Sequence, residues 1–577
     1  AIQCKCYADD ATLTEKQITN FIADAVAEKM KNKILVYTGA TLTSNANRIL
    51  KKTHCGIIQQ EHLRSSSIDW SEFPKLRVKD PFSLKEFQEI ARDDVLKGFE
   101  NHDRGKMIMA CGTGKTLVSL HLAEKIAKKG GLVLFLVPSI SLILQSMRSW
   151  SDNANIKHYY VAVCSDKSAG EEGSLTELES PVSTDVETLK TSIKKRPKDS
   201  MTVIFSTYHS IEVVEKATED EIFDIVISDE AHRTTGIEDK SFYTRVHKNE
   251  NINSKKRLYM TATPRIYSAA IKAKTGDALY SMNDEKTYGP EFHKLSFTDA
   301  VQKYHALSDF KVKIAIVPED VASKDMQQEV AGKEKSMPLD ERTLLAAVWH
   351  GLQYPDDDKS PPRLLQRVIA FCNRIDRSQM FAGVITDKND NSRSFEKVVQ
   401  EFNKVRPTPY KVEVGHVDGT NNALYRREKM RWLGRSTDDK KTCRILSNAR
   451  CLSEGVDVPA LDGVVFVNPR KSIVDVVQSV GRVMRKAEGK EFGYIILPVA
   501  VPSGIPTNEA LDDNKTFKVV WQVLNALRSH DEMFAKEINS LILDKKTENT
   551  SSVTNRISVS ILDDQNNDGP PITDMFD

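Results

Sequence analysis

The sequence predicts an α/β protein in which two parallel-sheet domains are preceded by a partial α/β module and followed by a helical segment. In two long stretches, short apolar runs alternate with segments of helical period, which is typical of doubly wound parallel sheets. The polar run YPDDDKSPP, residues 354–362, separates these stretches as a linker. We therefore divide the chain into residues 1–71, the module; 72–310, the first sheet domain; 311–362, a connecting segment and linker; 363–501, the second sheet domain; and 502–577, the helical segment.

Length and composition limit the function classes. The 577 residues are enough for three or four domains, because one core rarely serves more than roughly 300 residues. No apolar run approaches the roughly 18 residues of a membrane span, so we expect no membrane contact and a cytoplasmic location. The net charge is +1, from 82 basic and 81 acidic residues. A polyanionic partner must therefore be held by a local groove rather than by overall charge.

Cysteine usage and the start of the chain give two further expectations. The eight cysteines lack the paired spacing of a zinc site, and we expect free thiols in a reducing compartment. The sequence begins without Met inside a strand-like run, so we expect it to be part of a longer protein.

The module at residues 1–71 reads as strand, helix, strand, helix, strand. AIQCKCY, KILVYTG and GIIQQ have strand composition; Thr14 and Gln17 predict the start of a helix through Met30; and SNANRILKK predicts a short second helix. Gln3 and Lys5 flank one residue, so their side chains share a face of the first strand. An amide oxygen beside an ammonium suits a metal-dependent phosphodiester site. The alternative is that both side chains face solvent on an edge strand.

The most informative stretch is MIMACGTGKT, residues 107–116, in which an apolar strand runs into a glycine-bracketed loop. The following LVSLHLAEKIAKK has helical period, so the loop opens a helix. Backbone N–H groups and the positive end of the helix then face one phosphate cluster. Gly112 and Gly114 let the backbone curl around Thr113, Lys115 reaches the outer phosphates, and the Thr116 hydroxyl contributes to a Mg²⁺ shell. The alternative is a glycine-rich turn without a ligand.

Several later strands end in polar residues, at the sheet edge where ligands of such folds bind. Pro138 and Ser139 follow LVLFLV, and Thr207 and Tyr208 follow MTVIFS. Hydroxyl groups at these positions can contact a nucleic-acid backbone without reading its sequence.

The run FDIVISDEAHRT places adjacent carboxylates at the end of a buried strand. Their burial is costly unless they meet a cation. We expect Asp229 to hold Mg²⁺ through its water shell, and Glu230 to position and deprotonate the attacking water.

In the second sheet domain, the helix DVVQSVGRVMRK carries Gln478, Arg482 and Arg485 at spacings of four and three residues. We expect all three to project from one helical face. Guanidinium groups on that face could stabilise γ-phosphate charge across a domain interface. The alternative is a solvated basic face.

In order and spacing, these motifs resemble those of superfamily 2 helicases. PFSLKEFQEIARDDVLKGF resembles the Q motif, in which Gln88 would read adenine with Phe82 or Phe87 as a supporting aromatic residue. Asp-Glu-Ala-His resembles motif II, with His232 linking the ATP site to motif III, in which Thr261 and Thr263 would act in coupling.

Further motifs carry the resemblance into the second half of the chain. SNARCLSEGVDVP resembles motif V, with Gly455 and Asp457 at the nucleotide, and QSVGRVMR resembles motif VI, whose arginines act as fingers. The segments at Pro138-Ser139 and at Thr207-Tyr208 resemble motifs that touch the nucleic-acid backbone. The resemblance implies two RecA-like domains that use ATP and Mg²⁺.

The module at residues 1–71 resembles the Mrr-like branch of the PD-(D/E)xK nucleases. QCK, VYTGATLTSNA and the Gly-Ile-Ile strand carry this resemblance, which implies a Mg²⁺-dependent DNA nuclease with Gln3 and Lys5 in its site. The metal-binding Asp of that family lies on a preceding strand that this sequence does not contain, so we expect an incomplete nuclease.

Nuclease, motor and helical segment in this order resemble the type ISP and type I restriction enzymes of bacteria. The resemblance implies an ATP-dependent translocase on duplex DNA whose movement leads to cleavage, with methyltransferase and target-recognition domains further along a longer chain. Two alternatives stay open: a DNA or RNA helicase outside restriction, and a nucleotide-switched scaffold that binds DNA without moving.

Overall fold

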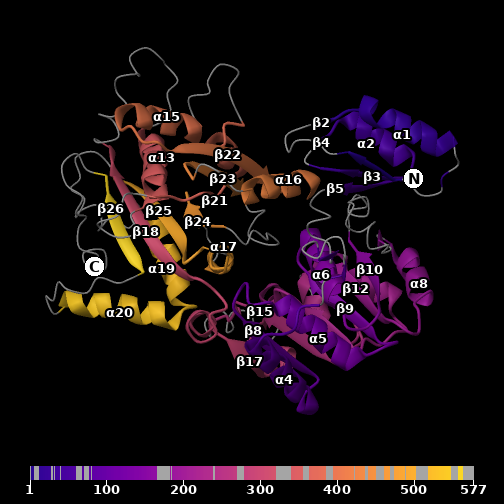
Figure 1. Cartoon of the computed structure of the whole chain (residues 1–577). Coiled ribbons are helices and arrows are strands. Elements are labelled where there is room, and N and C mark those ends of the chain that lie inside the picture. Colours follow the sequence, from indigo (N-terminus) through magenta and orange to yellow (C-terminus); the bar gives the residue numbers. More distant parts are fainter. Residues whose placement is uncertain are drawn as a thin grey trace.

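A computed structural model describes the chain (Figure 1). It describes residues 2–5, 12–27, 30, 33–38, 41–59, 68–69, 77–78, 81–164, 182–183, 185–237, 241–268, 279–319, 339–354, 363–384, 394–421, 423–435, 440–449, 461–467, 473–487, 489–501, 517–546 and 556–562. None of the helices within these ranges combines the length and hydropathy that crossing a bilayer requires.

The N-terminal module is a small parallel sheet with two helices. Its strands are β1 (Ile2–Lys5), β3 (Lys33–Tyr37) and β5 (Cys55–Gln59), in the order β1-β3-β5, with α1 (Glu15–Ala27) and α2 (Ser44–Lys52) between them. Short strand pairs are formed by β2 (Thr12–Leu13) with β4 (Thr41–Leu42) and by β6 (Ile68–Asp69) with β7 (Arg77–Val78). Apolar side chains from both helices and the sheet form the core, among them Ile18, Leu35 and Leu50. The expected strand and helix order is present, although α1 ends at Ala27 rather than Met30.

The first large sheet has eight strands in the order β11-β10-β12-β9-β13-β15-β8-β17, all parallel. Its strands are β8 (Arg104–Met109), β9 (Leu132–Val137), β10 (His158–Val163), β11 (Val182–Ser183), β12 (Met201–Thr207), β13 (Ile225–Ser228), β15 (Arg257–Thr261) and β17 (Glu291–Leu295). Its helices include α4 (Glu86–Asn101), α5 (Lys115–Ala127), α6 (Ile140–Asn153), α8 (Val186–Lys194), α9 (Ile211–Ala217) and α11 (Glu285–Tyr288). β14 (Gly236–Ile237) and β16 (Leu279–Tyr280) form a separate pair. Strands β9 and β12 are buried along their whole length, as near-continuous apolar runs predict.

The second large sheet has seven strands in the order β22-β23-β21-β24-β25-β18-β26, again all parallel. Its strands are β18 (Asp309–Pro318), β21 (Arg367–Cys372), β22 (Lys411–Asp418), β23 (Thr442–Ala449), β24 (Gly463–Phe466), β25 (Phe492–Val501) and β26 (Ile557–Ile561). The surrounding helices include α13 (Leu339–Leu352), α14 (Ile375–Phe381), α15 (Phe395–Val405), α16 (Ala423–Gly434), α17 (Ile473–Val483), α19 (Lys518–Arg528) and α20 (Glu532–Lys546). β19 (Gln353–Tyr354) pairs with β20 (Arg363–Leu364).

This topology corrects two expected boundaries. Residues 311–362 are not only a connecting segment, because β18 is a strand of the second sheet and α13 packs against it and β25. Residues 502–577 are not only helical, because β26 returns to pair with β18 at the edge of the same sheet. The apolar run FKVKIAIV does predict a strand that crosses to the next domain, as β18 does, whereas the return of β26 lies outside the strand and helix pattern of residues 363–501.

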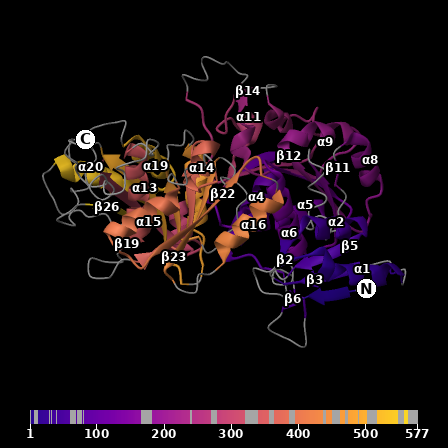
Figure 2. The same cartoon turned by 90° about the horizontal axis from the view of Figure 1, so that it is seen from above.

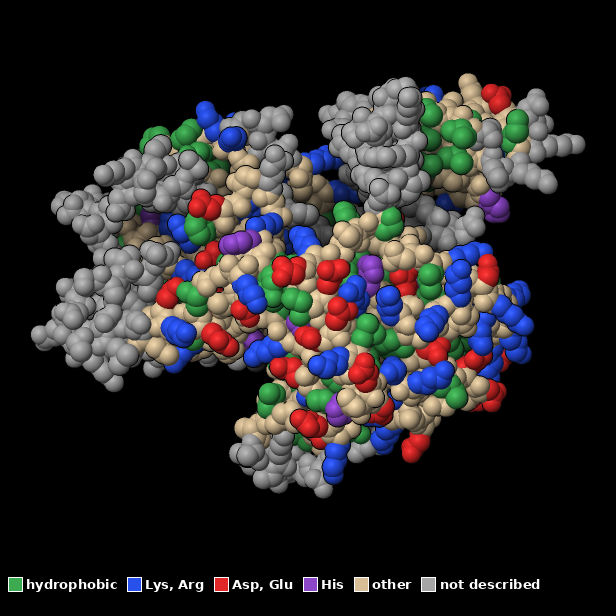
Figure 3. All heavy atoms as spheres, turned by 60° about the horizontal axis from the view of Figure 1, so that its bottom comes forward, with side chains coloured by type: hydrophobic (Ala, Val, Ile, Leu, Met, Phe, Trp, Pro, Cys, Tyr) green, Lys and Arg blue, Asp and Glu red, His purple; other side chains and the backbone are tan. Residues whose placement is uncertain are grey.

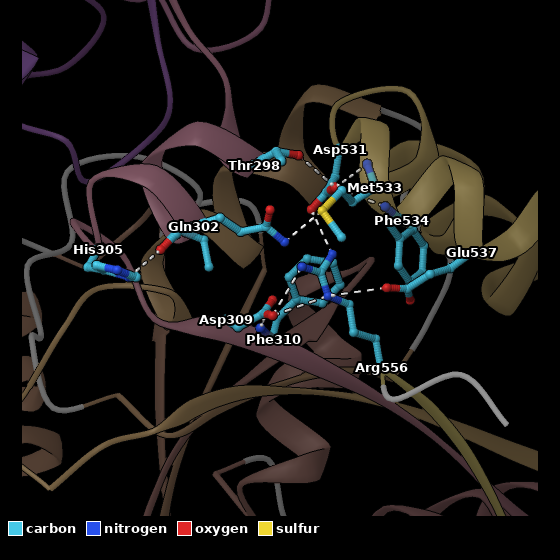
Figure 4. Close-up of polar contacts among 11 residues, drawn as sticks. Thr298, Gln302, His305, Asp309, Phe310, Asp531, Met533, Phe534, Glu537 and Arg556 are labelled. Carbon is cyan, nitrogen blue, oxygen red and sulfur yellow. Dashed lines mark hydrogen bonds and ion pairs between the residues drawn. The ribbon is translucent and has the colours of Figure 1, made fainter.

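A buried cluster of charged side chains holds β26 beside the segment that crosses from the first sheet to the second (Figure 4). Arg556, at the start of β26, contacts Asp309 at the start of β18 at 3.0 Å and Asp531 before α20 at 3.1 Å. The Thr298 hydroxyl, from the segment that leaves the first sheet, donates to Asp531 at 3.2 Å. The helical segment therefore rests on the crossing itself.

Candidate ATP site at the junction of the two sheets

The phosphate loop has the predicted backbone form. It runs from the end of β8 to α5, and Gly112 (φ +83°) and Gly114 (φ +88°) occupy the left-handed region that favours glycine. Gly114 is the residue before α5, so no side chain caps the first N–H groups of the helix. These donors are the ones that can bind an anion. The Lys115 ammonium donates to the Met109 carbonyl at 3.1 Å, close to the loop that it is expected to serve.

Gln88 lies on this loop, but with its amide engaged. Its Nε2 donates to the Thr113 carbonyl at 2.9 Å, and its Oε1 accepts from the Lys85 N–H at 2.9 Å. In this arrangement Gln88 holds the loop, and the expected adenine contact would require both bonds to change partners. Of the two expected aromatic residues, Phe87 is buried against Tyr304 with ring centroids 5.4 Å apart, whereas Phe82 is 73% exposed. Only Phe82 is accessible to a base.

The carboxylate pair lies at the end of β13, as the strand pattern predicts. Asp229 is buried, and burial together with the neighbouring Glu230 raises its pKa to about 7, while the Lys115 ammonium opposes the rise. Glu230 has φ +50°, an unfavourable conformation for a residue with a side chain. Its Oε2 is buried and has no hydrogen-bond partner among the described residues.

These observations fit a divalent cation. Two adjacent carboxylates, one of them with an unpartnered buried oxygen, form an excess of negative charge beside a single ammonium. Oxygen ligands of this kind are those that Mg²⁺ prefers. The residues that would hold it are Asp229 and Thr116, which is half-buried at the first turn of α5.

A chain of polar contacts leads from Glu230 to the end of β15. His232 Nδ1 lies 3.5 Å from Glu230 Oε2 and 3.1 Å from the Thr261 hydroxyl, which also accepts from the Thr263 N–H at 3.0 Å. Burial lowers the pKa of His232 to about 4, so the ring is neutral near pH 7. The structure thus brings the motif II and motif III residues into direct contact.

The second sheet meets the phosphate loop through α17. A Cβ atom added to Gly481 would lie 2.4 Å from the Cys111 Cβ, and one added to Gly112 would lie 3.2 Å from Arg485 Cγ. Gln478 is 3% exposed, and neither of its amide atoms has a partner among the described residues. Burial raises the pKa of the Cys111 thiol, and the nearby charges of Lys115, Arg482 and Arg485 oppose the rise. Motif VI therefore faces the loop across the junction.

One expectation about this helix is wrong. α17 ends at Val483, so Arg485 does not share a helical face with Gln478 and Arg482. Instead Arg485 forms an isolated β-bridge with Leu307, and the Ser308 N–H donates to the Met484 carbonyl at 2.7 Å. The segment that crosses between the two sheets bonds to the backbone of Met484 and Arg485, and the helix therefore ends before them.

The residues expected to touch DNA are mostly inaccessible. Pro138, Thr207 and Tyr208 are buried, so a direct side-chain contact with DNA is not available to them in this structure. The Tyr208 hydroxyl donates to the Asp229 carbonyl at 2.8 Å and so supports the ATP site. Ser139 is half-buried, immediately before α6. Gly455 and Asp457 of motif V lie outside the described residues.

In the N-terminal module, Gln3 and Lys5 share one face of β1. Both are half-buried while Ile2 and Cys4 are exposed, and Gln3 Oε1 is buried without a hydrogen-bond partner among the described residues. Within that same part of the chain, no three His, Cys, Asp or Glu side chains are grouped as a metal site would need. The two side chains are together, and the acidic partner that the nuclease family requires is not beside them.

Three residues at the ATP site carried no sequence signal. Trp150 donates its indole N–H to the Thr116 carbonyl at 3.0 Å, Leu307 packs against the phosphate loop, and Lys490 donates to the end of α17. They lie outside the motifs, and only the tertiary packing shows their contacts with the site.

Comparisons with known proteins agree with this geometry. Residues 1–79 match a family model described as restriction endonuclease, residues 81–266 match the res subunit of type III restriction enzymes, and residues 363–487 match the helicase conserved C-terminal domain. The chain is also 24% identical over 483 residues to the probable helicase A859L of African swine fever virus (strain Badajoz 1971 Vero-adapted), covering 83% of this chain and 47% of that protein.

Two solved structures are similar over much of the chain. The ATP-dependent Type ISP restriction-modification enzyme LlaBIII, bound to DNA, is 36% identical with a TM-score of 0.76, covering 96% of this chain and 37% of LlaBIII. A nuclease-deletion mutant of the Type ISP enzyme LlaGI, in complex with a DNA substrate mimic, is 33% identical with a TM-score of 0.55, covering 82% of this chain and 30% of that one. The chain thus spans less than half the length of these relatives. Region by region, it matches an Mrr-like nuclease module followed by a superfamily 2 helicase motor, and in this arrangement it resembles the type ISP restriction enzymes.

Proposed function

We propose that this chain is the nuclease and motor part of a bacterial, cytoplasmic restriction enzyme, in which ATP hydrolysis drives movement along duplex DNA and movement leads to cleavage. The observation that carries the proposal is the junction of the two sheets, where carboxylates of the first face guanidinium groups of the second across one phosphate loop. A site divided in this way opens and closes with the nucleotide, which is what a motor needs.

For hydrolysis, the loop amides and Lys115 would bind the β- and γ-phosphates, and Glu230 would accept a proton from the attacking water. The bond between the γ-phosphorus and the bridging oxygen then breaks, and ADP leaves with that oxygen. Arg482 and Arg485 would stabilise the negative charge on the transferred group. Mg²⁺, held by Thr116 and Asp229, would neutralise phosphate charge.

The response to nucleotide would pass through His232. Its ring connects the general base to Thr261, and the Thr263 hydroxyl is buried without a partner among the described residues. When Glu230 changes partners during hydrolysis, the His232 contact and the end of β15 can change with it. Gln88, which now holds the loop, would change partners in the same step.

For DNA, the supporting feature is α16, which extends from the second sheet domain toward the N-terminal module in both views (Figures 1 and 2). It carries basic side chains interleaved with aromatic ones: Lys429 lies 5.5 Å from the Tyr425 ring centroid and 5.9 Å from that of Trp432. On the face that Figure 3 shows, basic and acidic side chains are interspersed over the first sheet domain. A local basic element fits a chain whose net charge is only +1.

The test is triplex displacement, in which a moving motor removes a third strand from duplex DNA. We expect ATP-dependent displacement that Glu230→Gln and Lys115→Ala abolish, because the first removes the general base and the second the phosphate ligand. Glu230→Gln should still bind ATP. ATP hydrolysis stimulated by duplex DNA without displacement would favour the scaffold, and stimulation by RNA rather than DNA would favour an RNA helicase.

The nuclease proposal is tested separately. Gln3 and Lys5 are proposed to serve a metal-dependent DNA cleavage site, and because the described residues group no three metal-ligating side chains there, we expect this chain alone to leave supercoiled DNA intact with Mg²⁺. Nicking by this chain that Lys5→Ala removes would show that the site is already complete. Methyltransferase and target-recognition domains are proposed as its partners on a longer protein.

A further inference from the structure

The end of α17 is held from two sides, and one of the side chains that hold it is a half-buried lysine outside every predicted motif. Lys490 precedes β25 and donates its ammonium to three backbone carbonyls: that of Leu461 at 2.6 Å, that of Arg485 at 3.0 Å, and that of Val483. An ammonium has three N–H donors and no acceptor, so these three carbonyls use its full capacity.

The three carbonyls belong to segments that are expected to meet the nucleotide. Val483 is the last residue of α17, and Arg485 is the outer guanidinium of motif VI, so the ammonium neutralises the negative end of this helix. Leu461 directly follows residues 451–460, the stretch that contains the predicted motif V residues Gly455 and Asp457. One side chain thus ties together the ends of two segments that are expected to meet the nucleotide.

On its other side, Arg485 is bridged to Leu307, and Leu307 and Arg485 both approach Gly112 of the phosphate loop. With its backbone fixed on both sides, Arg485 has its side chain beside the loop. A misplacement of about 1 Å at such a group can cost roughly a hundredfold in rate.

We propose that Lys490 is a positioning residue for ATP hydrolysis, which fixes the backbone of Arg485 so that its guanidinium meets the transferred phosphate. The inference rests on the proposed role of Arg485 and adds the residue that holds it. Lys490 touches neither ATP nor water in this role.

The second sheet offers a matched control in Lys313 of β18. Its side chain is buried and donates to one backbone carbonyl, that of Gln353, at 2.5 Å. Burial lowers the pKa of both lysines from 10.5 to about 8. Lys313 is therefore alike in chemistry and at least as deeply buried, but within the described part of the chain its ammonium bonds to no motif residue.

The experiment compares Lys490→Met, Lys490→Arg and Lys313→Met with the parent chain, in DNA-stimulated ATP hydrolysis and in binding of a non-hydrolysable ATP analogue. For Lys490→Met we expect kcat to fall by about ten- to a hundredfold, with the Kd of the analogue changed less than about threefold, because the phosphate loop is intact. Lys490→Arg, which keeps the charge, should recover part of kcat. Lys313→Met should stay within about twofold of the parent. An equal fall in kcat in the two Met variants would overturn the proposal.

A double variant separates this inference from the assignment of Arg485. If Arg485 acts in catalysis, Arg485→Ala lowers kcat, and adding Lys490→Met to it should lower kcat little further, because the group to be positioned is gone. An Arg485→Ala chain with normal kcat would refute the role of Arg485 itself. A low-activity Arg485→Ala chain in which Lys490→Met still has its full effect would refute only the positioning role.

The pH profile gives a readout that folding alone would not produce. Asp462 favours and Arg485 disfavours the charge on Lys490. Above pH 8 the neutral Lys490 amine has only two N–H donors for three carbonyls. We therefore expect kcat to fall above this pH in the parent and in Lys313→Met. In Lys490→Arg the fall in kcat should occur at a higher pH. Because the folded pKa lies below the unfolded one, the unfolded state binds more protons between about pH 8 and 10.5, and this group makes the fold more stable as pH rises. Unfolding therefore does not explain such a fall, and its absence would contradict the proposal.

Discussion

At the scale of single residues, buried imidazoles link the stability of the first sheet domain to pH. His247 is fully enclosed, with Nε2 2.9 Å from the Thr234 carbonyl and Nδ1 3.0 Å from the Tyr259 hydroxyl. Burial lowers the pKa of His247 from 6.5 to about 4. The unfolded chain therefore takes up a proton between these values that the folded chain does not, and stability falls as pH falls through this window.

The variant His247→Gln tests this link, because an amide can keep both hydrogen bonds without titrating. At pH 7.5 we expect it to melt below the parent, since the smaller and more flexible amide side chain fills the packed site less well than the ring. Between pH 6.5 and 4 the difference should narrow, by up to about 3 kcal/mol for a shift of this size. Melting temperatures across this range measure it. The control is the exposed His209 replaced by Gln, whose melting temperature should differ from that of the parent by the same amount at every pH. A difference in melting temperature between His247→Gln and the parent that does not change with pH would contradict the prediction.

For single residues, prediction from sequence was right where neighbouring residues in the chain determine the backbone conformation. Gly112 and Gly114 have the left-handed conformation that a phosphate loop needs, because the need arises within a few neighbouring residues. It failed where tertiary contacts decide. Tyr208 follows a strand at the ligand edge, yet its ring is buried and its hydroxyl serves Asp229. A sequence shows that a polar residue ends a strand, but not which way the chain turns afterwards.

At the scale of elements, the cluster around Arg556 decides whether the helical segment stays attached. Its guanidinium faces the carboxylates of Asp309, Asp531 and Glu537, and burial raises the pKa of Glu537 (Figure 4). Asp531 also accepts from the Met533 and Phe534 N–H groups at the start of α20. The cation therefore joins two strands and a helix.

Replacing Arg556 by Met should cost roughly 3 kcal/mol, because it leaves buried carboxylates without their cation. We expect faster amide exchange in α20 and β26 than in β25, measured by mass spectrometry on the native chain. Arg444→Met is the control: Arg444 contacts the half-exposed Glu413 at 2.8 Å, and such a pair is worth about 1 kcal/mol or less. Unchanged exchange in α20 for Arg556→Met would mean that apolar packing alone holds the segment.

The helix α16 carries the second element-scale prediction. Replacing Arg426, Lys429 and Arg431 together by Gln should weaken binding of duplex DNA and lower the slope of log K against log salt by about 0.9 for each phosphate that the helix no longer neutralises. Changing Lys190, Lys194 and Lys195 of the first domain to Gln removes the same charge elsewhere. If the slope falls equally in the two triple variants, overall charge and not α16 governs binding.

The sequence predicts that a helix or strand forms where its hydrophobic periodicity is strong. That periodicity does not show which sheet a strand joins. The strand at residues 309–318 is largely apolar along its second half, but only pairing shows that it belongs to the second sheet. The end of α17 was predicted too late because helical spacing continues through Arg485 in the sequence. The bridge that ends the helix joins Arg485 to Leu307, which belongs to a distant part of the sequence.

At the scale of the whole molecule, α17 of the second sheet domain packs directly against the phosphate loop of the first, where Gly481 faces Cys111. A Cβ atom on Gly481 would lie 2.4 Å from the Cys111 Cβ, a distance that real atoms do not adopt. One hydrogen atom in place of a methyl group thus permits the separation at which Arg482 and Arg485 reach the loop. We propose that closure of the motor requires Gly481 to lack a side chain.

Gly481→Ala should therefore hold the two sheets apart. We expect kcat for ATP hydrolysis to fall by about tenfold or more, because a shift of about 1 Å at the guanidinium groups is costly, while the Kd of the ATP analogue changes little because the phosphate loop itself is untouched. Adding Cys111→Gly removes the opposing Cβ and should restore much of kcat, whereas Cys111→Ala keeps that Cβ and should not. Gly419→Ala, at a position with nothing within 4 Å of an added Cβ, is the control and should be normal. Equal activity of Gly481→Ala with and without Cys111→Gly would mean that the sheets do not close through this contact.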